Sequence, residues 1–376
     1  MPPVSLLIKP ASSSCNLRCA YCFYHDVSKK REIKNYGMMA HDVLETLVKR
    51  AFDEAEGKLA FAFQGGEPTL AGLDFYRAFI ELVKKYDRKR AEVSFAIQTN
   101  GVLLDDEWAA FLHENHFLVG LSIDGYKDLH DMNRADGKGK GSFQQGMRAA
   151  ELMTKRKVDF NILCVVNRLT ARHVDKVYSF YKKCGFRWLQ FIPCLDDIGE
   201  NRGGNQYSLT PALYEQFLNT LFDRWYADFM ANDGVSVRHF DNWVTMMLGH
   251  PAESCSMNGV CASYFVVEAD GSVYPCDFYV LDDWKLGNVV ADSFAEMRAS
   301  ARAEQFIRES VPVHEKCQEC ECFQLCRGGC KRDREKNADG MPGLNYFCEA
   351  HKGFFRYALP RMERIAMALR ANQRGY

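Results

Sequence analysis

Short apolar runs alternate with amphipathic stretches along the first two hundred residues of the chain. The runs are rich in β-branched and aromatic residues, as buried strands are, and the stretches between them repeat apolar residues with a helical period. Six such units predict an α/β fold with a parallel sheet, right-handed crossovers and chemistry at the carboxyl ends of the strands. Strands are expected at residues 5–8, 59–63, 93–97, 117–123, 158–166 and 188–192, and helices at residues 41–55, 73–85, 105–115, 143–155 and 171–184.

The chain changes character after the last of these units. Residues 211–248 read as a helix-rich bridge, and the segment beyond it is dense in cysteine. Because 376 residues exceed one average domain, a large domain followed by a smaller one is the simplest organisation. We expect the first domain, with the bridge, at residues 1–234 and the second at residues 235–376.

Composition narrows the class of protein. A net charge of -1 gives no electrostatic footprint for nucleic acid or for a membrane surface. The first residues lack a basic segment followed by a long apolar run, and no apolar stretch is long enough to span a membrane. The 15 cysteines lie in tight runs within a core-forming chain, which favours metal sites in a reducing compartment over disulfides. We therefore predict a cytoplasmic enzyme without a nucleic-acid or membrane partner.

Three cysteines with the spacing C-x3-C-x2-C follow the first expected strand, at Cys15, Cys19 and Cys22. A structural zinc site or an electron-transfer cluster normally has four protein ligands. Three thiolates around a four-iron cluster therefore leave one iron open to another ligand. A zinc site completed by the neighbouring His25 is the alternative that this loop alone leaves open.

Beyond residue 250, eight cysteines are candidate thiolate ligands, which is enough for two closed four-ligand sites. Such sets suit iron-sulfur clusters and zinc equally well, and spacing does not define which cysteines share a site. Among the remaining cysteines, Cys164, Cys184 and Cys194 are expected to be small buried apolar residues, and Cys322 could replace a neighbouring ligand. The eight candidates are Cys255, Cys261, Cys276, Cys317, Cys320, Cys326, Cys330 and Cys348.

Glycine and polar residues end the second and third expected strands. Residues 64–67 read Gln-Gly-Gly-Glu, in which two glycines let the backbone approach a ligand and the carboxylate of Glu67 can accept hydrogen bonds from an amine. A turn that simply ends the strand is the alternative. Gln98, at the end of the third strand, is expected to face the same cavity, although strand capping explains it equally well.

These segments resemble the signature motifs of the radical S-adenosylmethionine (SAM) superfamily, including the aromatic Tyr21 just before the last cysteine of the loop. The resemblance implies an open (β/α)6 partial barrel, similar to a TIM barrel. In that family the open iron binds the amine and carboxylate of SAM, and one electron cleaves SAM to a 5'-deoxyadenosyl radical. The cofactor contacts that the resemblance implies are Tyr21, Gln64, Gly65, Gly66, Glu67, Ser122, Asp124, Arg134 and Leu195.

The cysteine-rich second part resembles the SPASM extension of that superfamily, which holds two auxiliary 4Fe-4S clusters. The resemblance rests on C-x9-G-x4-C from Cys261, then C-x2-C-x5-C-x3-C from Cys317 and a last cysteine after a gap. It implies three 4Fe-4S clusters in all. It assigns Cys255, Cys261, Cys276 and Cys330 to one auxiliary cluster, and Cys317, Cys320, Cys326 and Cys348 to the other.

Along most of its length the chain is most similar to anaerobic sulfatase-maturating enzymes, in segments such as LLIKPASSSCNLRCAYCFYHD, FAFQGGEPTLAGL and FVVEADGSVYPCDFYVLDDWKLGN. This resemblance implies oxidation of a sulfatase cysteine, or a serine, to Cα-formylglycine. The deoxyadenosyl radical would take a hydrogen atom from the target Cβ, a base would take the thiol or hydroxyl proton, and a second electron would leave through an auxiliary cluster. The implied partners are a sulfatase polypeptide with a C-x-P-x-R pattern and an electron donor such as ferredoxin or flavodoxin, and the enzyme is expected to be a monomer.

Asp277 is the residue that we expect to act as the base, because the preceding Cys276 would fix the position of its carboxylate. A turn that uses the aspartate side chain is the alternative. Tyr24 and Gln98 are the candidate substrate contacts, although an aromatic ring at position 24 could equally shield the cluster from solvent.

Two other functions remain open at the level of sequence. Another SPASM enzyme could form thioether or carbon-carbon crosslinks in a ribosomal peptide, although many of these carry an added N-terminal peptide-binding domain and this chain begins almost at its barrel. A non-catalytic metal-binding module would hold zinc and would not cleave SAM.

Overall fold

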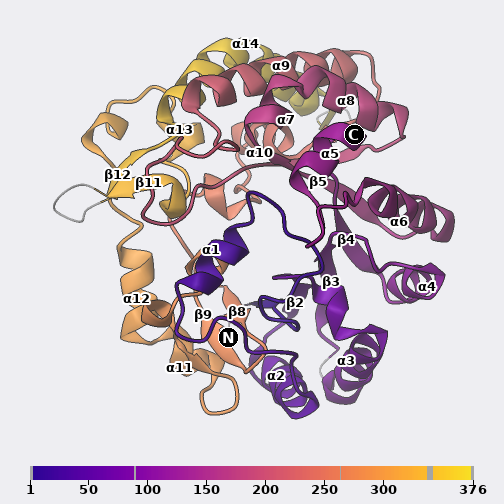
Figure 1. Cartoon of the computed structure of the whole chain (residues 1–376). Coiled ribbons are helices and arrows are strands. Elements are labelled where there is room, and N and C mark those ends of the chain that lie inside the picture. The colour runs from indigo at the N-terminus through magenta and orange to yellow at the C-terminus, as the bar shows by residue number, and fades with distance from the viewer. Residues whose placement is uncertain (1–2, 89, 263, 337–341, 374–376) are drawn as a thin grey trace.

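A single curved sheet of ten strands organises the computed structural model, which describes residues 3–88, 90–262, 264–336 and 342–373. Its strands follow the order β10-β9-β8-β1-β2-β3-β4-β5-β6-β7, and β1 to β7 are parallel to one another. Figure 1 shows the strands as an arc with helices around its outer side. These strands are β1 Val4–Ile8, β2 Lys58–Phe63, β3 Glu92–Thr99, β4 Phe117–Ser122, β5 Phe160–Val166, β6 Trp188–Pro193 and β7 Ser236–Val237.

The predicted α/β partial barrel is confirmed, and all six expected strands agree with the structure to within two residues at each end. Four of the expected helices are also single helices. The fifth is divided at His173, whose backbone leaves the helical region, and the helix before it is capped by the side chain of Asn167. The helices on the outer side are α2 His41–Glu54, α3 Leu73–Tyr86, α4 Asp106–Glu114, α5 Lys127–Asn133, α6 Phe143–Arg156, α7 Arg168–Arg172 and α8 Val174–Lys183.

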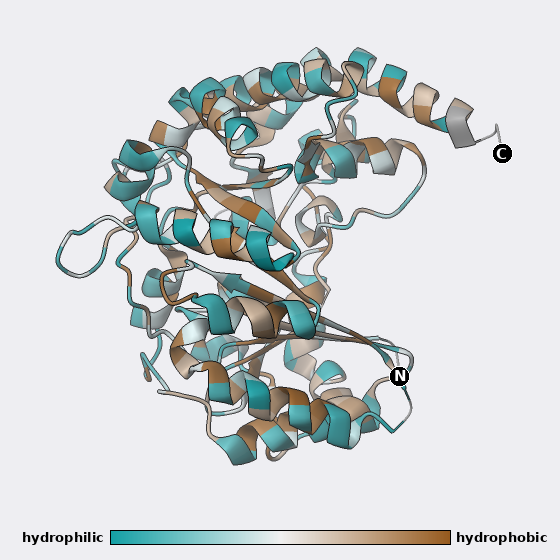
Figure 2. Ribbon diagram, turned by 90° about the vertical axis from the view of Figure 1, so that its right-hand side faces the viewer, coloured by the Kyte–Doolittle hydropathy of each residue, from teal (hydrophilic) through white to brown (hydrophobic). Residues whose placement is uncertain are grey.

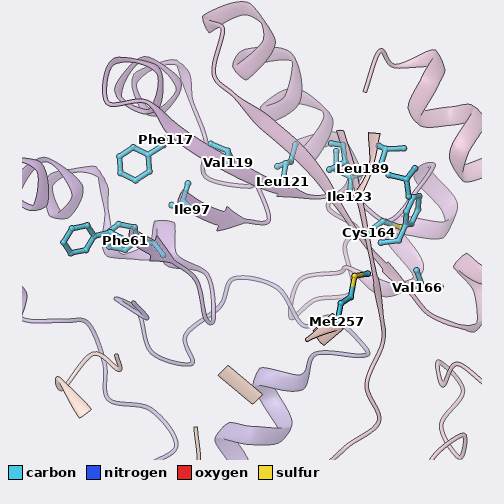
Figure 3. Packing of buried hydrophobic residues seen from close by; sticks show 14 of the residues in the cluster. Phe61, Ile97, Phe117, Val119, Leu121, Ile123, Cys164, Val166, Leu189 and Met257 are labelled. Atoms are coloured by element: carbon cyan, nitrogen blue, oxygen red, sulfur yellow. The ribbon is translucent and has the colours of Figure 1, made fainter. Parts of the chain in front are cut away.

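Alternation along the strands separates the core of the barrel from its cavity. In β2, Phe61 and Phe63 point outward and are buried under the helices, whereas Ala60 and Ala62 point inward and are only half-buried. Figure 2 shows the matching pattern on the helices, with hydrophilic surface on the outside and hydrophobic strands within. The buried side chains between the strands and the outer helices form one hydrophobic cluster, which includes Phe61, Val119 and Leu121 (Figure 3). Small inward side chains therefore leave space inside the arc.

The second part of the chain extends the same sheet. Strand β8 (Phe265–Val267) runs parallel to β1, with Leu7 paired to Val266. Strands β9 (Ser272–Tyr274) and β10 (Gly287–Asn288) continue the edge, and both pairings are antiparallel. Sheet hydrogen bonds thus link the two predicted domains, whose boundary at residues 234 and 235 stays a prediction.

Helices of the bridge and of the second part close the arc (Figure 1). The long helices α9 (Pro211–Met230) and α14 (Cys348–Gln373) pack against each other. No helix among the described residues is long and apolar enough to cross a membrane. The other elements are α1 Phe23–Lys29, α10 Arg238–Met247, α11 Phe294–Arg298, α12 Ala301–Arg308, α13 Phe323–Cys326, β11 Arg334–Lys336, β12 Pro342–Asn345, and the 3-10 helices η1 Pro68–Ala71, η2 Cys255–Met257, η3 Asp277–Tyr279, η4 Asp282–Trp284, η5 Glu315–Cys317 and η6 Lys331–Asp333.

Candidate active site

A cavity of about 700 Å³ lies inside the arc, and most of the predicted site residues line it. A groove of about 1010 Å³ between α10, α13 and α14 is larger, but none of the predicted site residues is among those that line it. The predicted residues that line the inner cavity are Cys15, Cys19, Tyr21, Cys22, Tyr24, Gln64, Gly65, Gly66, Glu67, Gln98, Ser122, Arg134, Leu195, Cys255, Asp277, Cys326 and Cys330.

The loop with the first three cysteines connects β1 to α1. The Leu17 amide donates a hydrogen bond to the sulfur of Cys15, and Asn100 at the end of β3 binds Asn16 of the same loop at 2.7 Å. Burial raises the pKa of Cys15 to about 11 and that of Cys19 to about 12, and the neighbouring thiols add to both shifts. Binding of a metal to these thiols would therefore release protons.

The glycine loop after β2 packs directly on the backbone of the cysteine loop. Gly65 and Gly66 have φ angles of 85° and 53°, which favour glycine. A Cβ atom at Gly66 would collide with the carbonyl oxygen of Ser14, and that oxygen also accepts a hydrogen bond from the Glu67 amide at 2.7 Å. The two predicted SAM-binding segments are thus held together by close backbone contact.

The carboxylate of Glu67 is turned toward the protein. It accepts hydrogen bonds from the amide and hydroxyl of Thr69, from the hydroxyl of Thr99 and from the amide of Asn100. Burial raises the pKa of Glu67, and these donors oppose that shift. Although Glu67 lines the cavity, its contacts join β2 to β3, a role that sequence reasoning missed because it assigned the carboxylate to the amine of SAM.

Asp124 lies behind the wall of the cavity and holds two residues that line it. Its carboxylate is fully buried and accepts hydrogen bonds from Tyr21, from Nε of Arg134 at 2.9 Å and from the Val165 amide. Arg134 also lies over the ring of Tyr21 and within 4.0 Å of the Cys19 sulfur. The structure therefore brings together Tyr21, Asp124 and Arg134 as predicted, but gives Asp124 an internal position instead of a direct place on the cavity.

Asp277 lies in η3, immediately after Cys276, and its side chain is buried at the cavity. Oδ2 accepts a hydrogen bond from the Tyr24 hydroxyl at 2.5 Å and a longer one from Gln64 at 3.5 Å. Oδ1 is buried and has no hydrogen-bond partner among the described residues. Burial raises the pKa of Asp277 to about 6, and Lys9 and Tyr24 oppose that shift. The arrangement fixes one carboxylate oxygen and leaves the other available for a proton.

A buried ion cluster behind Asp277 was not predicted from the sequence. Nζ of Lys9 lies over the ring of Tyr24 at 5.0 Å and donates to Glu268 at 2.7 Å. Arg31 donates to the same carboxylate oxygen at 2.5 Å. Burial would raise the pKa of Glu268, but the two cations lower it to about 2. Lys9 is only 2% exposed, and no local sequence pattern indicated that this lysine would be buried.

The eight later cysteines separate into two groups in space. Burial raises the pKa of most of these thiols, and nearby thiols add to several of the shifts. Cys276 and Cys255 add to that of Cys330, and Cys348, Cys317 and Cys320 add to that of Cys326. Cys322 is buried beside Cys320, and Cys164 and Cys194 are buried as expected, while Cys184 is half-buried. One group contains Cys255, Cys261, Cys276 and Cys330, and the other contains Cys317, Cys320, Cys326 and Cys348.

The chemistry of these three thiol sets fits iron-sulfur clusters. A cubane cluster binds each thiolate at a different iron, so its ligands need not converge on one point. Among the described residues, no group of three or more histidine, cysteine or acidic side chains lies close enough to hold a single metal ion. His25, the candidate fourth ligand of a zinc site, is exposed and is not among the residues that line the cavity.

Comparison with known proteins matches both parts of the chain. Residues 10–181 match the radical SAM superfamily, and residues 255–321 match SPASM, an iron-sulfur cluster-binding domain. A cysteine-type anaerobic sulfatase-maturating enzyme from Clostridium perfringens is 52% identical over 97% of this chain and 99% of its own length. A serine-type enzyme from Bacteroides thetaiotaomicron is 32% identical over 96% of this chain and 91% of its own. The structure of native anSMEcpe with bound AdoMet and Cp18Cys peptide has a TM-score of 0.94 at 51% identity and covers 98% of this chain and 100% of that one.

Proposed function

The chain belongs to the anaerobic sulfatase-maturating enzymes of the radical SAM superfamily, and we propose that it oxidises an active-site cysteine of a sulfatase to Cα-formylglycine with Asp277 as the base. The observation that carries the role of Asp277 is its buried carboxylate. This group reaches the same cavity as the first cysteine loop and has one oxygen without a partner among the described residues. Family membership also confirms four-iron clusters and SAM as cofactors, which removes the zinc alternatives.

The thiol sets would hold these groups. Cys15, Cys19 and Cys22 would bind the cluster at which SAM is cleaved, and the two later sets would bind the auxiliary clusters. When bound, the first cluster and SAM supply the 5'-deoxyadenosyl radical that takes a hydrogen atom from Cβ of the target cysteine.

The chain's own residues then have defined tasks. The substrate loses a hydrogen atom, one proton and one further electron to become a thioaldehyde, and Oδ1 of Asp277 takes the proton from the thiol. Water then hydrolyses the thioaldehyde to the aldehyde and releases the sulfur as hydrogen sulfide. Tyr24 and Gln64 hold Oδ2, so that Oδ1 faces a thiol placed in the cavity. Arg134, positioned by Asp124, offers a buried positive charge to the carboxylate of SAM. Gly65 and Gly66 leave room for a ligand at the backbone, and Ser122, Leu195 and Gln98 complete the wall.

We propose the partners on the basis of the family resemblance and this chemistry. The substrate is a sulfatase polypeptide with the C-x-P-x-R pattern, and a small redox protein such as ferredoxin or flavodoxin supplies the first electron. The enzyme acts as a monomer in the cytoplasm, where a reducing environment keeps its cysteines available as ligands.

A single assay tests this function. A sulfatase-derived C-x-P-x-R peptide, incubated anaerobically with the enzyme, SAM and a reductant, should lose about 18 Da as cysteine becomes formylglycine. A serine version, if it is accepted, should lose only about 2 Da. An unmodified sulfatase peptide, together with crosslinking of a cysteine-containing precursor peptide, would instead establish the peptide-crosslinking alternative.

A further inference from the structure

The hydroxyl of Tyr264 lies between a cluster ligand and the base. It accepts a hydrogen bond from the backbone amide of Asp277 at 3.1 Å and lies 3.7 Å from the sulfur of Cys276. The side chain lines the cavity, and β8 begins at the next residue. Pairing of β8 with β1 therefore anchors Tyr264 to the sheet of the barrel.

The two contacts define the direction of both hydrogen bonds. An amide N–H can only donate, so the Tyr264 oxygen is the acceptor toward Asp277. The single hydroxyl proton is then free to point at the sulfur of Cys276. A tyrosine hydroxyl ordinarily holds its proton near neutral pH, so it can act as a donor here.

A donor to a cluster thiolate changes the cluster that the thiolate binds. Hydrogen bonds to the sulfurs of an iron-sulfur cluster favour its more negative, reduced state and thereby raise its reduction potential. Partners of ligating residues also fix the orientation of the ligand. The same hydroxyl holds the backbone at Asp277, so one group affects both the electron acceptor and the base.

We propose that Tyr264 is a positioning residue that couples the auxiliary cluster at Cys276 to the base Asp277, raising the reduction potential of that cluster while it holds the loop of the base. This inference rests on the proposed function, because it takes Cys276 as a ligand and Asp277 as the base. It adds an electronic role for a residue whose hydroxyl contacts the Cys276 sulfur and the Asp277 amide.

Replacement of Tyr264 by phenylalanine tests the proposal, because it removes one oxygen and keeps the ring. In Tyr264→Phe, iron content and SAM cleavage should match the wild type, whereas the midpoint potential of one auxiliary cluster should become more negative in an anaerobic redox titration followed by EPR. The yield of formylglycine per SAM cleaved should fall roughly 10-fold or more.

Tyr279→Phe is the matched control. Tyr279 lies in the same 3-10 helix as Asp277, and Cys330 and Cys276 both affect its pKa, yet no hydrogen bond from its hydroxyl to a cysteine sulfur occurs among the described residues. In Tyr279→Phe, the midpoint potential of the auxiliary cluster and the yield of formylglycine per SAM cleaved should stay at the wild-type values. An unchanged potential or an unchanged yield in Tyr264→Phe would overturn the proposal.

A second variant keeps the test decisive if Tyr264→Phe loses its cluster. Incorporation of 3-fluorotyrosine at position 264 preserves the shape and makes the hydroxyl a stronger donor, so the potential should become more positive. A potential that does not move, or that moves to more negative values, would contradict the proposal. Failure of the wild-type enzyme to form formylglycine would instead contradict the proposed function.

Discussion

The Tyr24 hydroxyl donates a hydrogen bond to Asp277 at 2.5 Å and thereby ties the helix after the first cysteine loop to the loop after Cys276. Helix α1 begins at the residue that follows Cys22, so the position of the Asp277 carboxylate depends on the first cysteine loop as well as on the loop after Cys276. The two segments lie 253 residues apart in the sequence. This hydrogen bond therefore couples the position of the Asp277 carboxylate to that of the first cysteine loop.

Asp277→Asn should separate SAM cleavage from substrate oxidation. The amide keeps the size of the side chain and its acceptor for Tyr24, but it cannot take a proton. We expect normal iron content and SAM cleavage, with formylglycine formation reduced roughly 10²-fold or more, as measured by peptide mass spectrometry. Asp283→Asn, at an exposed aspartate of the following 3-10 helix, is the control and should be fully active. Full activity of Asp277→Asn would remove this residue from the mechanism.

Glu67→Gln should destabilise the protein even without SAM. The carboxylate accepts four hydrogen bonds, and an amide nitrogen in place of Oε2 would face the donor of Asn100. The free energy of unfolding should fall by about 1–3 kcal/mol in denaturant titrations. Glu107→Gln, which removes an exposed pairing with Arg77, should change it by less than about 1 kcal/mol. If Glu67 served only to bind the amine of SAM, the stability of the SAM-free protein would not change.

Removal of the first cysteine set should affect iron content and radical formation together. If all eleven predicted ligands are used, the anaerobically purified enzyme should contain about 12 iron atoms per chain. Replacement of Cys15, Cys19 and Cys22 by alanine should remove roughly a third of this iron and abolish SAM cleavage. Cys184→Ala, at a half-buried cysteine outside the three sets, is the control for iron content. SAM cleavage by the triple variant would refute the assignment of this loop.

The free energy of unfolding should fall as the pH is lowered through the range in which His130 gains a proton. Burial lowers the pKa of this histidine to about 4, against the opposing influence of Asp124. Its Nδ1 accepts a hydrogen bond from the Asp124 amide, which only the neutral ring can do. Since the unfolded chain binds a proton near pH 6.5, the contribution of His130 is complete above that pH and is lost as the pH falls toward 4.

The linked free energy is about 3 kcal/mol in full, and about 2 kcal/mol of it should appear in denaturant midpoints of the cluster-loaded protein between pH 5 and 7.5. His130→Gln should reduce the pH slope in this window. His250→Gln, at an exposed histidine, should leave the slope unchanged. A wild-type slope that does not exceed that of His130→Gln would show that this buried histidine is not responsible.

The features that the sequence made predictable are those carried by contiguous residues. The strand pattern located β1 to β6, and the residues that follow each strand, such as Gly65 and Gly66, could be placed because parallel strands align their carboxyl ends. The pairing of β8 with β1 could not be predicted, since three apolar residues at 265–267 carry no signal for a partner strand. The sequence around Lys9 is that of an ordinary surface lysine, because its partner Glu268 lies far away along the chain. No local pattern predicts the contact between the Tyr264 hydroxyl and the Cys276 sulfur.

The two strands that pair with β1, β2 and β8, are synthesised at very different times during translation. Strand β2 leaves the ribosome soon after β1, but β8 and Glu268 follow only when some 259 further residues have been added. At 5–20 residues per second this takes roughly 10 to 50 s. During that interval one edge of the nascent sheet is open and Lys9 has no buried counterion, so water must solvate it. The barrel can therefore close around its cavity only after most of the protein has been made.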